Sequence, residues 1–334
     1  MSMMTLICAI ISFCITVFSG KYIIKKLQLL NFGQTIYEEG PSWHKGKNGT
    51  PTMGGIMFIL GIVLSSLVVI IFYAVRYGGF SAGADLVPII AGILTALGFS
   101  LIGFIDDYIK VVKKRNLGLT AIQKLIFQFL IAGVFIYTLE FSGVIDTSEI
   151  LLPFFGEVNL GWVYYPIAAV SIVFIVNAVN LTDGLDGLAA SVTSVCSIGY
   201  LVIAVLLEKT LTASVSAALL GGVLGFLVYN RYPAKVFMGD TGSMFLGGMV
   251  VVLAFTMRYP GLIFLMGGLY IIEALSVCLQ VFWYKLTKTR IFLMSPIHHH
   301  YEKKGYSENK IVKLFSAIEL IFVIVAVLGT VIRI

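Results

Sequence analysis

The sequence predicts an all-α polytopic membrane protein with ten transmembrane helices. Of its 334 residues, 59% are apolar and only 12% are charged, and the mean hydropathy is +0.99. Soluble domains are about half apolar and about a quarter charged. A helical span needs roughly 20 residues, so this apolar content allows about ten spans and leaves only short loops. The composition excludes nucleic-acid-binding modules, large extramembrane domains and secreted disulfide scaffolds.

Ten long apolar segments, separated by charged or Pro/Gly-rich breaks, define the spans. They are residues 3–24, 53–76, 87–105, 121–140, 161–180, 188–207, 212–230, 244–257, 262–286 and 311–333. The first lacks both a preceding basic region and a following cleavage pattern, which favours a retained helix over a signal peptide. The four cysteines lie inside apolar runs without CxxC spacing, so we interpret them as packing residues.

The distribution of Lys and Arg predicts the orientation. Of the 23 basic residues, all but Arg76, Lys209, Arg258 and Arg333 fall in or beside the loops that follow spans one, three, five, seven and nine. Basic loops stay on the cytoplasmic side. We therefore expect these loops to be cytoplasmic and both termini to be extracytoplasmic. On the outer side, residues 141–161 predict a short external β-hairpin.

Two adjacent carboxylates, Asp106 and Asp107, end the third span. Neighbouring residues on a helix point about 100° apart, so the two side chains cannot act from one face. Carboxylates at a membrane boundary indicate a divalent cation, a proton acceptor, or one of each. The alternative is a solvated helix end balanced by the lysines that follow.

Two further clusters combine carboxylates with glycines. The segment from Asn177 to Gly187 repeats polar residues at every third position, and Gly184 and Gly187 let backbone N–H groups approach a ligand. The segment from Phe237 to Ser243 brackets a carboxylate and a hydroxyl with glycines ahead of a span, which suits Mg²⁺ and phosphate oxygens. Helix capping is the alternative for both segments.

Three consecutive histidines, His298, His299 and His300, lie in the last basic loop. Consecutive side chains cannot all converge on one metal ion without distorting the backbone. Hydrogen bonds to phosphate, sugar or a carboxylate fit better, and an incidental loop run is the alternative. All four clusters fall on the predicted cytoplasmic face. Together they supply carboxylates for a metal, cations for phosphates and an aromatic ring for a base, which indicates phosphoryl transfer from a nucleotide.

These motifs resemble a known family. Asp106-Asp107-Tyr108, the segments 177–187 and 237–243, and Pro296-Ile-His-His-His-Tyr-Glu302 resemble the polyprenyl-phosphate N-acetylhexosamine-1-phosphate transferases. The histidine segment, with residues 49–55 and 116–120, is similar to the phospho-N-acetylmuramoyl-pentapeptide transferase (MraY) branch. The resemblance covers essentially the whole chain, and the chain departs from the usual pattern at Tyr301 and Lys303.

The resemblance implies an Mg²⁺-dependent enzyme of the bacterial plasma membrane, with residues 1–334 forming a single transmembrane catalytic domain. It would transfer phospho-MurNAc-pentapeptide from UDP-MurNAc-pentapeptide to undecaprenyl phosphate, giving lipid I and UMP, and family members commonly dimerise. The implied catalytic residues are Asp106, Asp107, Asp240 and His299, with Asp240 as the Mg²⁺ ligand. The implied substrate-binding residues are Lys47, Lys110, Lys124, Asn177, Asn180, Asp183, Gly184, Leu185, Asp186, Phe237, Gln280, His298 and His300.

Several alternatives stay open from the sequence. The transfer could proceed by direct attack of the lipid phosphate or through an aspartyl-phosphate on Asp106 or Asp107. A sister transferase using UDP-GlcNAc would not need the histidine segment, and a transporter would need an inverted repeat that the sequence lacks. Span nine is long enough either to bend along the membrane interface or to tilt. Glu273 lies inside that span, where an ionisable group needs a partner, but the sequence does not name one.

Overall fold

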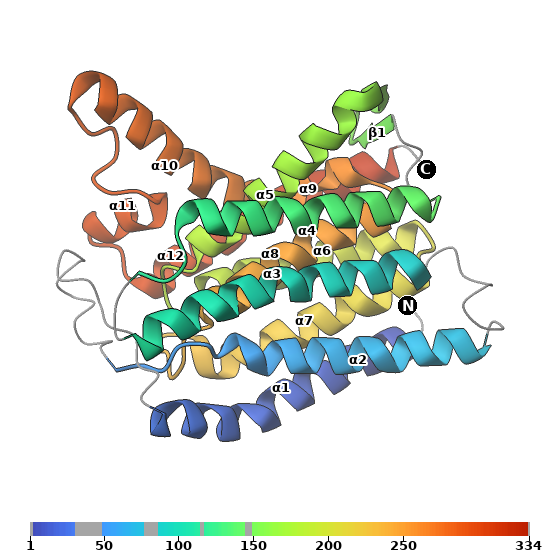
Figure 1. The fold of residues 1–334 in the computed structure, drawn as a ribbon, viewed down its shortest axis with the longest axis horizontal. Helices are drawn as coiled ribbons and strands as arrows, with labels where there is room; N and C mark the ends of the chain where they lie inside the picture. Colours follow the sequence, from blue (N-terminus) through green and yellow to red (C-terminus); the bar gives the residue numbers. More distant parts are fainter. Residues whose placement is uncertain (1–2, 31–48, 77–85, 114–116, 144–148, 333–334) are drawn as a thin grey trace.

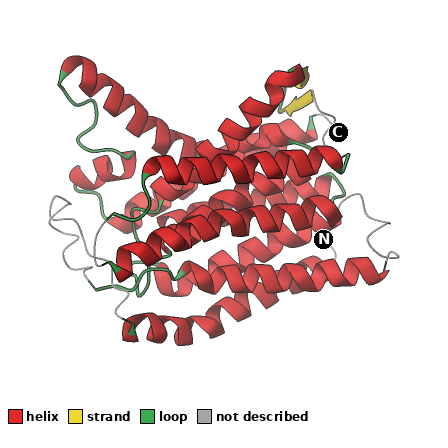
Figure 2. Ribbon diagram, viewed as in Figure 1, coloured by secondary structure: helices red, strands yellow, loops and turns green. Residues whose placement is uncertain are grey.

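The protein is almost entirely helical (Figure 2) in a computed structural model that describes residues 3–30, 49–76, 86–113, 117–143 and 149–332. The α-helices are α1 Met3–Leu29, α2 Gly55–Arg76, α3 Leu86–Val112, α4 Ala121–Phe141, α5 Tyr164–Thr182, α6 Leu188–Leu206, α7 Thr210–Asn230, α8 Gly239–Thr256, α9 Ile263–Met266, α10 Gly268–Thr287, α11 Ile297–Lys303 and α12 Glu308–Val331. Two 3₁₀ turns, η3 Gly161–Val163 and η4 Pro260–Leu262, precede α5 and α9.

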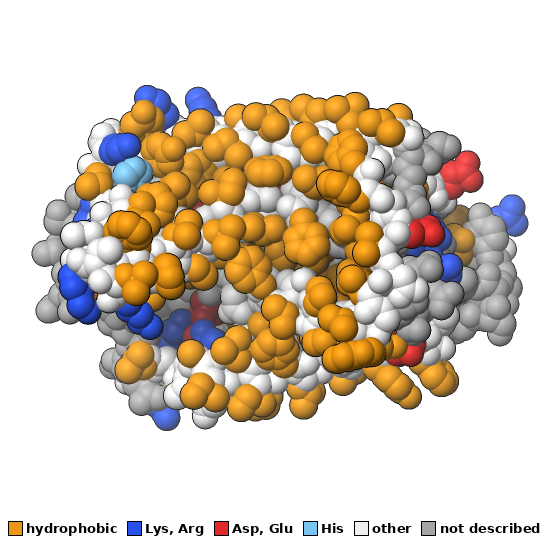
Figure 3. All heavy atoms as spheres, turned by 90° about the horizontal axis from the view of Figure 1, so that it is seen from above, with side chains coloured by type: hydrophobic (Ala, Val, Ile, Leu, Met, Phe, Trp, Pro, Cys, Tyr) orange, Lys and Arg blue, Asp and Glu red, His pale blue; other side chains and the backbone are white. Residues whose placement is uncertain are grey.

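Ten helices within the described residues are long and apolar enough to cross a membrane, as the sequence predicts. The N- and C-termini lie at the same end of the bundle (Figure 1), which an even number of spans requires. Seen from above, hydrophobic side chains cover the middle of the molecule, and Lys and Arg side chains gather at the opposite end (Figure 3). The assignment of the end with the termini to the extracytoplasmic side stays a prediction.

Helix α8 forms the centre of the bundle. Of the residues in its apolar window, 89% are buried, and its largest interface is with α3. Small residues permit this close packing. A Cβ on Gly103 of α3 would meet the carbonyl oxygen of Asp240 at 2.2 Å, and one on Gly55 of α2 would meet the Cα of Gly242 at 2.3 Å. The N-terminus of α8 is therefore held directly against α2 and α3.

A two-stranded antiparallel hairpin lies between α4 and α5, at the end with the termini (Figure 1). Strand β1, Glu149–Leu152, pairs with β2, Gly156–Asn159, so that Leu152 faces Gly156 across the turn. Phe154 and Gly156 both adopt positive φ, which closes this tight connection. The hairpin lies within the segment for which the sequence predicts one, and its external location stays a prediction.

The predicted ninth span, 262–286, is wrong as a single helix. It consists of η4, the short α9 and then α10, with a break at Gly267. A Cβ on Gly267 would meet the carbonyl oxygen of Ile263 at 2.6 Å, so a side chain there would strain the break. After the break, α10 runs away from the bundle (Figure 1), and only 28% of its apolar window is buried. Leu279 and Phe282 are exposed on it, as expected for a helix that faces lipid.

Candidate active site

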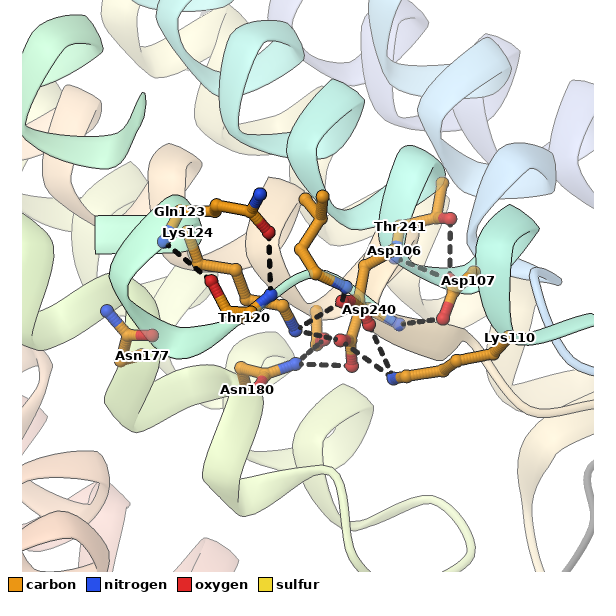
Figure 4. A network of polar contacts seen from close by, with 12 residues as sticks. Asp106, Asp107, Lys110, Thr120, Gln123, Lys124, Asn177, Asn180, Asp240 and Thr241 are labelled. Carbon is orange, nitrogen blue, oxygen red and sulfur yellow. Dashed lines mark hydrogen bonds and ion pairs between the residues drawn. The ribbon is translucent and has the colours of Figure 1, made fainter. Parts of the chain in front are cut away.

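Five charged side chains from three helices meet (Figure 4) where α3 ends and where α4 and α8 begin. This is the end of the bundle opposite the termini (Figure 1). We call Asp106, Asp107, Lys110, Lys124 and Asp240 the ionic centre. The three carboxylates each offer an oxygen within 4.8 Å of the others. The clustering that the sequence predicts from widely separated motifs is therefore present.

Both lysines of the ionic centre bridge the same two carboxylates. Lys110 Nζ lies 2.6 Å from Asp106 Oδ2 and 3.1 Å from Asp240 Oδ2. Lys124 Nζ lies 3.1 Å from Asp106 Oδ1 and 2.8 Å from the same Asp240 oxygen. Asn180 Nδ2 donates to the other oxygen of Asp240 at 2.9 Å. Asp106 is fully buried, so these partners offset the cost of removing its charge from water.

Asp107 has a different set of partners. Its oxygens accept hydrogen bonds from the backbone N–H of Asp240 at 3.2 Å and of Thr241 at 2.9 Å, and from the Thr241 hydroxyl at 2.7 Å. These N–H groups belong to the first turn of α8 and have no partner within that helix. Asp107 on α3 thus caps α8 and fixes where Asp240 lies. The two adjacent aspartates therefore have different partners, lysines for Asp106 and the first turn of α8 for Asp107, and their separate roles stay a prediction.

Local sequence around these residues explains their geometry. Gly239 has φ +70°, and a Cβ there would lie 2.5 Å from Asp107 Oδ2, so glycine is needed. On the other side, the Leu119 N–H donates to Asp106 Oδ1 at 2.7 Å. Thr120 and Gln123 then form a capping box that starts α4 and places Lys124 in its first turn.

A divalent cation fits this donor set. Hard cations such as Mg²⁺ prefer carboxylate oxygens, and the ionic centre offers three from separate side chains. The ammonium groups of Lys110 and Lys124 both contact Asp240 Oδ2. A cation bound there would compete with these ammonium groups for Asp240.

The loop between α5 and α6 carries four of the predicted substrate-binding residues. Asp186 accepts a hydrogen bond from the Ala234 N–H at 2.9 Å, and its own N–H donates to Glu308 Oε2 at 3.0 Å. Leu185 is buried, whereas Asp183 and Gly184 are partly exposed. Although part of Asp183 is exposed, its carboxyl group is withdrawn from water, which raises its pKa to about 8, and the carboxylate of Asp240 adds to the shift. The capping alternative fails here, because no side chain caps α6.

The three histidines lie on α11 and have three different partners, two of which are carboxylates of the kind expected from the sequence. His298 Nδ1 is 3.1 Å from Glu273 Oε1, and both side chains are fully buried. His299 Nδ1 is 2.6 Å from Glu302 Oε2. His300 Nδ1 accepts the Leu293 N–H at 3.1 Å, which requires an unprotonated nitrogen. Burial and the nearby Lys304 lower the pKa of His300, in agreement with a neutral ring.

The remaining predicted site residues lie in other surroundings. Asn177 points away from the ionic centre (Figure 4) and exchanges hydrogen bonds with Gln128 of α4. Gln280 Oε1 accepts the N–H groups of Ile291 and Phe292, so it orders the loop after α10. The backbone of Phe237 pairs with the segment that precedes α2, and its ring is half-buried. Lys47 lies outside the described residues.

The structure also identifies contacts that the sequence did not. Glu273 has a partner, His298, and the Nε2 of this histidine would lie 2.2 Å from a Cβ on Gly184. Gly118 lies so close to Asp106 that a Cβ would meet its Oδ1 at 2.3 Å. The intramembrane position of Glu273 signals a partner in the sequence, but its identity depends on where α11 folds back.

The fold and the ionic centre define a multi-pass membrane protein with a phosphate-compatible site at one end of its helical bundle. The family described as glycosyl transferase family 4 matches residues 89–258, which carry Asp106, Asp107 and Asp240. A signature of the phospho-N-acetylmuramoyl-pentapeptide-transferases matches residues 47–59.

Curated relatives are similar over nearly the whole chain. The phospho-N-acetylmuramoyl-pentapeptide-transferase of Caldicellulosiruptor bescii is 45% identical over 96% of this chain and 96% of its own length. The protein of the same name from Halalkalibacterium halodurans is 44% identical with the same coverage. That of Acetivibrio thermocellus is 43% identical over 94% of this chain and 92% of its own length. The chain belongs to the phospho-N-acetylmuramoyl-pentapeptide-transferase family.

Proposed function

We propose that this protein transfers phospho-MurNAc-pentapeptide from UDP-MurNAc-pentapeptide to undecaprenyl phosphate, giving lipid I and UMP in the first membrane step of peptidoglycan synthesis. The observation that carries the proposal is the ionic centre, in which two lysines and three carboxylates meet where spans α3, α4 and α8 end or begin. Phosphoryl transfer needs such a combination of cations for phosphate oxygens and carboxylates for a metal.

The chain's own residues can bind and orient both phosphates. In the absence of substrate, Lys110 and Lys124 are neutralised by Asp106 and Asp240. When anionic substrate arrives, the same ammonium groups can turn to its oxygens, because both are partly exposed. Mg²⁺, held by Asp240 with help from Asp106 or Asp107, would neutralise the pyrophosphate and stabilise the leaving UMP. Asn180 keeps Asp240 oriented through its hydrogen bond.

We favour direct attack by the lipid phosphate over a covalent aspartyl-phosphate. Asp107 already accepts three hydrogen bonds from the first turn of α8, which supports a positioning role rather than a nucleophilic one. Asp106 is fully buried and paired with both lysines. Its carboxylate would accept any proton that remains on the lipid phosphate and hold the lysines in place.

The other predicted residues would bind the rest of the nucleotide sugar. In this proposal the ring of Phe237, the loop residues Asp183, Gly184, Leu185 and Asp186, and Lys47 and Gln280 serve the nucleoside. His298, His299 and His300 on α11, with Asn177 and Asn180, would serve the sugar and phosphates. The active site would face the cytoplasm of the bacterial plasma membrane, and the catalytic unit would be a single domain that dimerises.

The test of the activity is UMP release from UDP-MurNAc-pentapeptide by the purified protein. Release should require both Mg²⁺ and undecaprenyl phosphate. Asp240→Asn keeps the side-chain shape but removes the charge, and it should lower the rate by about 10²- to 10³-fold, as expected for a group that stabilises developing charge. The matched control is Glu157→Gln on β2, which removes a carboxylate at the other end of the bundle. It should leave the rate of UMP release unchanged.

The same assay separates the alternatives. Release of UMP without lipid acceptor, together with a phosphorylated Asp106 or Asp107, would contradict direct attack. Faster turnover of UDP-GlcNAc than of UDP-MurNAc-pentapeptide would contradict the proposed substrate. Release that is independent of Mg²⁺ would contradict the proposed cofactor.

A further inference from the structure

A second charged feature lies at the same end of the bundle, in a cavity between α7 and α12. The cavity has a volume of about 550 Å³. Val228 and Tyr229 at the end of α7, the segment that follows it, and Asn309 and Lys313 at the start of α12 line it. None of these residues belongs to the ionic centre. We call this feature the α7–α12 cavity.

Three cations from separate segments line the α7–α12 cavity. Arg231 follows the last residue of α7, Lys235 lies in the segment before α8, and Lys313 lies one turn into α12. All three are exposed. Across the described ranges, no carboxylate comes within ion-pair distance of any of them, and the lining includes no acidic residue. Three like charges around one cavity repel one another unless an anion lies between them.

Hydrogen bonds hold the walls of the cavity in place. The side chain of Asp186 accepts the N–H of Ala234 in one wall, while its backbone N–H donates to Glu308 at the start of α12 in the other. The Lys235 N–H also donates to the carbonyl of Tyr229 at 2.8 Å. The cavity is therefore preformed, and its cations do not have to be brought together by a ligand.

The position of the cavity indicates a lipid rather than a soluble anion. It lies where α7 ends and α12 begins, at the boundary between the apolar spans and water. Val228 lines it and is 46% exposed, and Leu224 one turn earlier is also exposed. On α12, Leu320 and Ile324 continue the face of Lys313 toward the middle of the span and are exposed as well. Acyl chains could follow these apolar faces while a headgroup occupies the cavity.

We propose that the α7–α12 cavity binds the phosphate headgroup of an anionic bilayer phospholipid. Arg231, Lys235 and Lys313 contact the phosphate, since basic pockets between transmembrane helices at the cytoplasmic boundary bind such headgroups. Asn309 and Tyr232 are available to hydrogen-bond the remaining polar atoms. This site is separate from the ionic centre and does not depend on the proposed transfer activity.

The test compares the purified protein in nanodiscs of phosphatidylglycerol and of phosphatidylcholine. Native mass spectrometry counts the lipids retained, and a competition series gives the relative affinity. The triple variant Arg231→Gln, Lys235→Gln, Lys313→Gln should bind phosphatidylglycerol at least about tenfold more weakly, because each cation near the surface contributes separately. Binding of phosphatidylcholine should not change.

The matched control is Lys285→Gln, Lys288→Gln, Arg290→Gln, which removes the same charges from exposed positions at the end of α10. It should keep the phosphatidylglycerol preference of the wild type. An equal loss in both triple variants would show general attraction by net charge and overturn the proposal. So would displacement of the lipid by glycerol 3-phosphate at similar concentration, because that result assigns the cavity to a soluble phosphate.

A variant that leaves every charge in place covers a failure of the triple variant to fold. Val228→Trp fills the cavity from a half-exposed position. It should also weaken phosphatidylglycerol binding, by several fold. Unchanged lipid binding combined with a higher KM for the nucleotide sugar would instead assign the cavity to the soluble substrate. The rate of UMP release at saturating substrate, measured in parallel, tests the proposed function independently.

Discussion

The ionic centre and the histidine segment are held in place in different ways. The ionic centre lies where α3 meets α8, the most extensive helix pair in the described bundle. The three histidines lie on an arm formed by α10 and α11, Gly268–Lys303, and α10 is largely exposed. Close helix packing fixes the carboxylates, whereas a few buried polar contacts fix the arm. Regions with few buried contacts open at lower free energy, so we expect the arm to move more readily than the centre.

Removing a lysine should have the largest effect, because it breaks the centre itself. Lys124→Met leaves Asp106 and Asp240 with a single shared cation. We expect the rate of UMP release to fall by about 10²- to 10³-fold, as for other groups that stabilise developing charge. Lys113→Met, an exposed lysine at the end of α3, is the matched control. A similar loss of rate in the control would mean that the net positive charge of this end of the protein, rather than the contacts of Lys124 with Asp106 and Asp240, supports the reaction.

Breaking the buried contact that joins α10 to α11 within the arm should lower the free energy of unfolding and not only the catalytic rate. Glu273→Ala leaves His298 fully buried without its carboxylate partner. Removing one partner of a buried pair costs about 3 kcal/mol or more. Thermal unfolding in detergent measures this loss. Glu302→Ala is unsuitable as a control because Glu302 is itself buried and pairs with His299, so Cys278→Ala on the exposed face of α10 serves instead. An unchanged unfolding temperature for Glu273→Ala would contradict a stabilising pair.

The contact between the arm and the α5–α6 loop can be tested at one glycine. Gly184→Ala places a Cβ 2.2 Å from His298 Nε2, so the ring or the loop must shift. Overpacking of this kind costs about 1–3 kcal/mol. We expect a higher KM for the nucleotide sugar with a smaller change in kcat. Gly133→Ala on α4 has open space around the new methyl group and should be neutral or slightly stabilising.

The smallest expected effect is a pH dependence from Asp183. Its pKa of about 8 in the folded protein lies above the ordinary value of 3.8, so the folded state keeps a proton that the unfolded state releases. Stability therefore falls as the pH rises between these two values, and the loss is complete above the folded pKa. Asp183→Asn should flatten the fall in unfolding temperature between about pH 4 and about pH 8, measured with a chelator present. Equal slopes in both proteins would contradict this cause.

The comparison also explains which features the sequence could predict. Apolar runs predict the ten spans because length and hydropathy alone define them. The break at Gly267 cannot be predicted in this way, because the sequence around it stays apolar. The clustering of Asp106, Asp107 and Asp240 follows from their common face. The partner of each carboxylate cannot be predicted from that face, because it depends on how α3 packs on α8.

Side chains with several partners available are the hardest to assign. Asn177 belongs to a polar strip, yet it pairs with Gln128, which lies on a different helix. Gln280 binds the backbone of its own loop. Both amides offer donors and acceptors to whichever neighbour lies nearest, so their roles follow from tertiary structure rather than from spacing.

The central position of α8 has a further consequence. A bilayer that thickens or thins changes the tilt of the helices that it touches. Because 89% of its apolar window is buried, α8 touches little lipid, and its first turn is held by Asp107 from a neighbouring helix. Hydrophobic mismatch therefore acts on peripheral helices such as α1, α10 and α12 and is largely absorbed there. We therefore expect the distances among Asp106, Asp107 and Asp240 to change little with the thickness of the membrane in which the protein lies.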